Sequence, residues 1–148
     1  MVDSAAASLG GLDVLVNNAG VFFAHPIDEV DYETWQQAWA DTLGVNLVGA
    51  ANVTWCALQH MPRESGSRIV NVGSRGAYRG EPDIPAYGAS KAGLHAFGQS
   101  MAQRLAPRGI ASEAPTMPTG NARSAGSAAS CPSRGRWSTS PGARPSRS

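Results

Sequence analysis

The sequence lacks the features of a secreted, membrane-inserted or metal-binding protein. Its 148 residues include two cysteines, so no disulfide framework is expected, and unpaired thiols suit a reducing cytosol. The N-terminus has no basic segment followed by an apolar one, and no apolar run approaches the length that spans a membrane. His25, His60 and His95 show no metal-ligand spacing. We therefore expect a cytoplasmic protein without a metal site.

Large apolar residues are nearly missing from residues 111–148. This segment has no Leu, Ile, Val, Phe or Tyr, but it contains nine Ser, five Pro, five Arg and four Gly. Such a composition cannot bury enough surface to offset chain entropy, so we expect a disordered tail and no strand after Ile110. We hypothesise that the tail is a shifted reading frame of a GC-rich gene, which the nucleotide sequence would test.

The tail is also an unsuitable nucleic-acid arm. Its charge is +4, from five Arg and Glu113, whereas residues 1–110 carry seven basic and ten acidic groups, or −3. Nucleic-acid binding by a tail needs clustered positive charge. The arginines are dispersed instead, at Arg123, Arg134, Arg136, Arg144 and Arg147. We expect no nucleic-acid partner.

Residues 1–110 carry the pattern of an α/β domain. Leu12–Val16 and Ile69–Val72 are short apolar runs that suit buried parallel strands. One long helix is predicted from an N-cap at Asp31 to about residue 60, and a second over residues 87–105. Residues 1–11 are typical of the end of an earlier helix, with Gly10-Gly11 as its stop.

Tyr87 and Lys91 are four residues apart at the head of the second helix, so both side chains lie on one helical face. A phenol that exchanges protons at neutral pH needs its pKa lowered by about 3 units, or about 4 kcal/mol. A lysine charge about 4 Å away supplies about that much at an effective dielectric near 20. Taken alone, the pair is also typical of an ordinary helix surface.

Other polar residues give this pair a context. Ser74 lies thirteen residues before Tyr87, at the end of a predicted strand, where open α/β sheets bind their ligands. Asn46 lies twenty-eight residues before Ser74, and Asn18 lies twenty-eight before Asn46. With these motifs the chain, from about Val2 to Ile110, resembles the short-chain dehydrogenase/reductase family. The matching stretches are Leu12–Gly20, Val45–Gly49, the strand that ends in Ser74, and Tyr87-x-x-x-Lys91.

The resemblance implies a doubly wound, Rossmann-like parallel sheet that binds NAD or NADP. In that family's pattern Tyr87 would be the general acid or base, and Lys91 would lower the Tyr87 pKa and bind the nicotinamide ribose. Ser74 would hold the substrate oxygen, and the backbone carbonyl of Asn46 would anchor a water that connects Lys91 with solvent. The cofactor would also lie against the turn Asn18, Ala19 and Gly20.

The family's opening unit, a strand, a glycine-rich turn and a helix that receives the pyrophosphate, is missing. Gly10-Gly11 precedes a strand and so is no phosphate cradle. Gly73-Ser74-Arg75-Gly76 follows a strand, but Pro82 and Pro85 argue against an immediate helix and favour a substrate-side loop. The acidic residue that would bind the adenosine ribose is absent too, which leaves NAD and NADP both open.

The sequence thus predicts a partial α/β domain over residues 1–110, without the first βαβ unit, and a low-complexity tail over residues 111–148. Its expected reaction, by resemblance, interconverts an alcohol and a carbonyl compound. The isolated chain is expected to be inactive, because the strand that should pair with Leu12–Val16 is missing and leaves an open sheet edge that is prone to aggregation. The alternative is a non-catalytic dimerisation module that pairs with full-length relatives through the two long helices. A third option is an incomplete gene product with no role.

Overall fold

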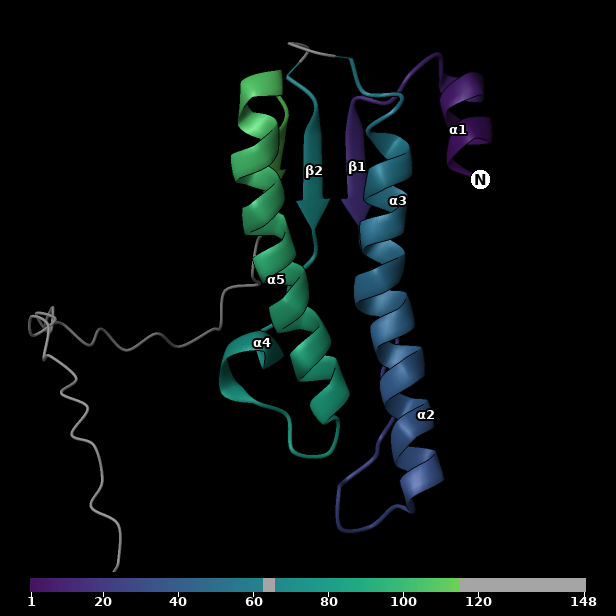
Figure 1. Ribbon diagram of the computed structural model, residues 1–148, viewed down its shortest axis with the longest axis vertical. Helices are drawn as coiled ribbons and strands as arrows, with labels where there is room; N and C mark the ends of the chain where they lie inside the picture. The colour runs from purple at the N-terminus through teal and green to yellow at the C-terminus, as the bar shows by residue number, and fades with distance from the viewer. Residues whose placement is uncertain (63–65, 115–148) are drawn as a thin grey trace, which may run out of the picture.

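A three-stranded parallel sheet forms the centre of the molecule (Figure 1). The computed structural model describes residues 1–62 and 66–114. Strand β1 (Val14–Asn17) pairs with β2 (Arg68–Asn71), which pairs with β3 (Ala111–Glu113). All three strands are parallel, with helical crossovers between them, so the α/β class and the partial parallel sheet are confirmed.

Strand β3 corrects the expectation that no strand follows Ile110. Ala111 donates its N–H to the carbonyl of Ser67 at 3.0 Å, and Glu113 stands opposite Val70 in the register. The Glu113 carboxylate also accepts from Arg68 at 3.3 Å. Backbone pairing with β2 therefore creates a strand whose own residues have little strand propensity. Residues 115–148, the rest of the predicted tail, lie outside the described residues.

The predicted long helix over residues 31–60 is interrupted by a π-helix. It begins as expected at Asp31, whose carboxylate accepts from the N–H of Thr34 at 2.8 Å and whose pKa that bond lowers. It then divides into α2 (Tyr32–Leu43), a π-helix η1 (Gly44–Gly49) and α3 (Ala50–Ala57). A Cβ on Gly49 would lie 3.1 Å from the carbonyl oxygen of Gly44, so glycine suits this widened turn.

The remaining helices flank these elements. Helix α1 (Val2–Leu9) ends at Gly10 with φ 77°, the left-handed stop that was predicted. A four-residue helix α4 (Gly76–Arg79) follows β2, contrary to the expectation of no immediate helix there. Gly80, with φ 73°, ends it before the prolines begin, so they do not prevent it. Helix α5 (Pro85–Leu105) carries a proline in its first turn and continues into the 3-10 helix η2 (Ala106–Arg108).

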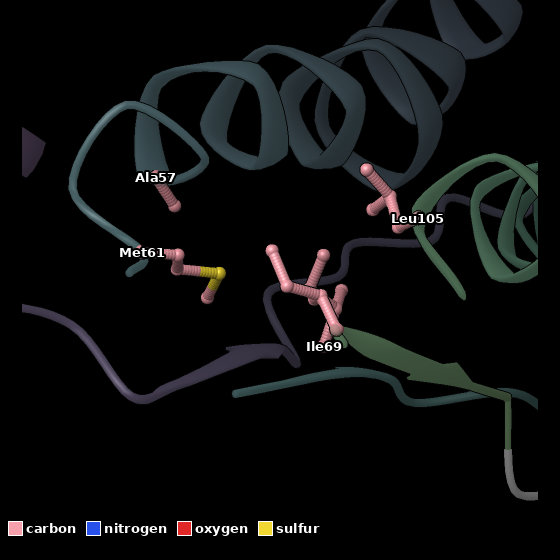
Figure 2. Close-up of a cluster of buried hydrophobic side chains, with 5 residues drawn as sticks. Ala57, Met61, Ile69 and Leu105 are labelled. Carbon is pink, nitrogen blue, oxygen red and sulfur yellow. The ribbon is translucent and has the colours of Figure 1, made fainter. Parts of the chain in front are cut away.

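The core lies between the helices and one face of the sheet. Figure 2 shows Ile69 of β2 directed toward Ala57 of α3 and Leu105 of α5, with Met61 beside them. On the opposite face Val14 and Val16 of β1 are 56% and 54% exposed. Parallel sheets normally bury both faces, so the described residues form one half of a doubly wound arrangement.

Candidate active site

The predicted site residues gather at the carboxyl edge of the sheet, beside the first turns of α5. Asn18, Ala19 and Gly20 directly follow β1, and Ser74 lies three residues after β2. Because parallel strands end at the same sheet edge, segments that are far apart in the sequence meet there. Helix α5 crosses this edge (Figure 1) and brings Tyr87 and Lys91.

Lys91 is buried at this edge, with 4% of its surface exposed. Its ammonium nitrogen Nζ donates to the carbonyl of Val72, just after β2, at 2.9 Å. The same nitrogen lies 5.8 Å from the centre of the Tyr87 ring. The two side chains therefore share a helical face, as their spacing predicted. Tyr87 itself is half-buried, and its ring makes a T-shaped contact with the Phe22 ring, with 5.9 Å between ring centres.

Burial lowers the pKa of Lys91 from its usual 10.5, because the charged amine loses hydration. Between the folded pKa and 10.5 the unfolded chain binds more protons than the folded one, so stability should rise with pH across that range. Lys91 is the sole lysine in the sequence, so lysine labelled with ¹³C at Cε gives one signal to titrate. We expect its midpoint to be lower in the folded chain than in urea, and equal midpoints would contradict the burial.

Asn46, in the π-helix, connects the turn after β1 with α5 and is fully buried. Its side-chain oxygen accepts from the N–H of Val21 at 2.8 Å, and its amide nitrogen donates to the Val21 carbonyl at 2.9 Å. The same nitrogen donates to Ser90 Oγ at 3.0 Å, and Ser90 Oγ donates to the Tyr87 carbonyl at 2.8 Å. One asparagine thus holds both the turn and the helix that carries Tyr87.

Gly20 of the turn lies close to these groups. A Cβ on Gly20 would lie 3.5 Å from Asn46 Oδ1 and 3.6 Å from Lys91 Nζ. Asn18, Ala19 and Gly20 are exposed, which leaves this surface open to a ligand. Ser74 is half-buried, and its Oγ accepts from the N–H of Gly76 at 3.2 Å. The hydroxyl proton of Ser74 can therefore be directed to another acceptor.

Sequence reasoning missed a buried polar network behind the site. Asn17 and Asn71 stand opposite each other in β1 and β2, and Asn17 Nδ2 donates to Asn71 Oδ1 at 2.9 Å. The same nitrogen donates to Thr54 Oγ1 of α3, also at 2.9 Å. The signal for both asparagines was a polar residue at the end of an otherwise apolar strand run. This network joins the sheet to α3 at the carboxyl ends of β1 and β2.

The described residues fit one end of a nicotinamide dinucleotide better than its pyrophosphate. Tyr87 and Lys91 offer a hydroxyl and an ammonium group for ribose oxygens. A pyrophosphate needs the N-terminus of a helix after a strand, but α4 has only four residues. Helix α2 starts with the carboxylate of Asp31, which repels phosphate. Residues 1–62 and 66–114 show no glycine-rich turn followed by a long helix.

The described part of the chain has neither a cluster of metal-binding side chains nor a helix suited to span a membrane. There, no three His, Cys, Asp or Glu side chains gather in a way that holds a metal ion. Across the same residues, no helix combines the length and hydropathy that crossing a bilayer requires.

Known proteins resemble this chain in sequence. Residues 1–121 match the short chain dehydrogenase family, a match that runs past the expected limit at Ile110. An uncharacterised oxidoreductase of Schizosaccharomyces pombe is 39% identical over 111 residues, which are 74% of this chain and 37% of the relative. The 3-oxoacyl-acyl-carrier-protein reductase of Vibrio cholerae is 35% identical over 68% of this chain and 40% of the reductase. The chain thus spans about two fifths of the length of these curated relatives.

Solved structures agree with the sequence matches. A short chain dehydrogenase from Burkholderia cenocepacia in complex with NADP has a TM-score of 0.66 and 38% identity, over 75% of this chain and 43% of its own. A blue fluorescent protein from a metagenomic library in complex with NADPH has the same TM-score and coverage at 37% identity. Because the family match covers most of the sequence and the parallel sheet superposes as well, this chain belongs to the short-chain dehydrogenase/reductase family.

Proposed function

We propose that this site interconverts an alcohol and a carbonyl compound with NAD or NADP. The observation that carries the proposal is the buried Lys91 ammonium, 5.8 Å from the centre of the Tyr87 ring, at the carboxyl edge of a parallel sheet. When bound, the nicotinamide supplies or accepts the hydride. Complexes of relatives with NADP and NADPH support a dinucleotide and leave its choice open.

The residues of this chain would divide the proton chemistry. The Tyr87 hydroxyl donates a proton to the carbonyl oxygen during reduction and takes one from the alcohol during oxidation. Lys91 places its ammonium group near the Tyr87 ring, 5.8 Å from the ring centre. The Ser74 hydroxyl donates a hydrogen bond to the substrate oxygen as negative charge develops on it. A π-helix changes the backbone hydrogen bonding around Asn46, whose carbonyl would hold a water that connects Lys91 with solvent.

We further propose that these 148 residues alone do not turn over substrate. The outer edge of β1 has no strand partner among the described residues, and Val14 and Val16 are largely exposed beside it. A dinucleotide would therefore lack a surface for its pyrophosphate, as the short α4 and the acidic cap of α2 indicate. The whole reaction needs the strand, glycine-rich turn and helix that the family places before β1.

A chimeric chain tests both statements. It joins the part of the V. cholerae reductase that precedes the matched segment to residue 1 of this chain. Binding is measured by NADH and NADPH fluorescence, and turnover by nicotinamide absorbance with a panel of carbonyl compounds. We expect neither signal from the chain alone and both from the chimera. Micromolar binding by the chain alone would contradict the missing-surface argument, whereas a folded chimera that binds cofactor but reduces nothing would contradict the reaction.

A second function is supported by the outer surface of the helices. Val45 and Val48 of η1 and Trp55 of α3 are 40%, 52% and 67% exposed, so exposed apolar side chains recur along these two segments. Such a surface suits a dimerisation module that pairs with a second copy or with a full-length relative. Co-purification with a relative, without nicotinamide binding, would favour this function. Trp55→Glu should abolish the pairing, whereas Tyr78→Glu, on the distant α4, should not.

A further inference from the structure

Among the described residues, His25 is a fully buried titratable side chain that the proposed chemistry does not use. It has 0% of its surface exposed, although Phe22 and Phe23, just before it, are 66% and 45% exposed. The N–H of Ala86 donates to His25 Nε2 at 3.3 Å, and Nδ1 lies 2.7 Å from the Phe23 carbonyl oxygen. An amide N–H only donates, so Nε2 is the acceptor and the proton of the neutral ring lies on Nδ1.

The hydrogen bond from Ala86 to His25 satisfies a backbone N–H in the first turn of α5. The first N–H groups of a helix have no partner within the helix, and Pro85 carries no N–H. The N-cap residue Ile84 makes no side-chain cap. His25 therefore caps α5 from sixty-one residues away in the chain. The backbone N–H of His25 also donates to the carbonyl of Asp83 at 2.8 Å, which fixes the residues just before α5.

The imidazole ring is held in place by aromatic neighbours. Its centre lies 5.3 Å from the ring of Trp35 and 6.5 Å from that of Trp39, both on α2 and both in edge contacts. Such contacts leave the ring little freedom to rotate. A fixed ring is what a cap with a defined direction requires, because the acceptor must stay aimed at Ala86.

The segment that contains His25 also meets Tyr87. Asn46 holds Val21 at the start of this segment, and His25 holds Ala86 at its other end. Between them, the rings of Phe22 and Tyr87 make a T-shaped contact. Tyr87 directly follows Ala86, so any shift of the first turn of α5 moves the phenol.

We propose that His25 is a positioning residue for Tyr87, which it aims by capping the first turn of α5. The inference rests on the proposed function, in which Tyr87 moves the proton. Substitutions separate the ring from its hydrogen bond: His25→Phe keeps a ring among the tryptophans but offers no acceptor. His25→Gln offers a carbonyl oxygen near the place of Nε2 and so retains the acceptor.

The first test uses the 148-residue chain, ¹⁵N-labelled, in solution NMR. The His25 ring should show a protonated Nδ1 and an unprotonated Nε2. The Ala86 amide should exchange with solvent at least tenfold faster in His25→Phe than in the native chain, with a weaker Phe22–Tyr87 ring cross-peak, and His25→Gln should restore both. A protonated Nε2, or unchanged Ala86 exchange in His25→Phe, would overturn the proposal.

The second test uses turnover by the chimera. We expect His25→Phe to lower kcat about tenfold, with the KM for the carbonyl substrate unchanged, and His25→Gln to recover most of that loss. Unchanged kcat in His25→Phe would overturn the positioning role. A folded chimera that binds cofactor but turns over nothing in any variant would refute the proposed reaction instead, and the NMR results would still decide whether His25 positions Tyr87.

Discussion

Replacing Tyr87 with phenylalanine is expected to lower turnover by the chimera by about 10²–10⁴-fold, the usual contribution of a general acid or base. The change removes one hydroxyl and keeps the ring that packs against Phe22. Tyr87 is half-buried, so part of its side chain or backbone remains open to solvent. Cofactor binding should fall much less than kcat, because the chemical step loses its proton donor.

A matched control for this change is Tyr78→Phe. Tyr78 is 63% exposed on the short helix α4, and it loses the same atom without a proposed part in the reaction. Its kcat should stay close to that of the unsubstituted chimera, because the Tyr78 hydroxyl has no part in the proposed reaction. Steady-state kinetics with both variants decide the matter. If Tyr87→Phe were as active as Tyr78→Phe, the proton donor would have to be another group.

Asn46→Ala is expected to destabilise the chain by about 4 kcal/mol. The substitution removes three hydrogen bonds and leaves the N–H and the carbonyl of Val21 without their side-chain partner. Unpartnered buried groups cost about 1–3 kcal/mol each. Urea unfolding, followed by tryptophan fluorescence, measures the change as a lower midpoint with the same slope.

Two further variants sharpen this measurement. Asn52→Ala removes the same side chain from an exposed position on α3, and it should change stability by less than about 0.5 kcal/mol. Asn46→Asp keeps an acceptor for the Val21 N–H but turns a carboxylate oxygen toward the Val21 carbonyl. It should therefore be strongly destabilised at neutral pH and partly recover as acid protonates the carboxylate. A loss below about 1 kcal/mol in Asn46→Ala would show that the turn is held by other contacts.

Features that depend on neighbouring residues in the chain were predictable. The Asp31 cap, the Gly10 stop and the shared face of Tyr87 and Lys91 involve groups at most four residues apart. Short-range geometry of this kind is the same in any fold. The strands β1 and β2 were also found, because their apolar runs are typical of a buried parallel sheet.

Other features could not be predicted because their causes lie far away in the sequence. Residues 111–113 form a strand because β2 offers them backbone partners, although Ser112 and Glu113 favour no strand. The sequence around His25 showed only that no metal-ligand spacing was present. Its acceptor role needs Ala86, and Ala86 comes within reach only when the chain has folded.

The residue types and their local spacing were sufficient to determine the family and the direction of the sheet, and they predict the residues that would carry the proton. Tertiary structure alone decided how these residues are held, through Asn46 and its bonds to Val21 and Ser90, and through His25 at the head of α5. The physical reason is range. Helical faces and caps follow from bonds between near neighbours, whereas a buried polar group takes whichever partner the packed chain brings to it.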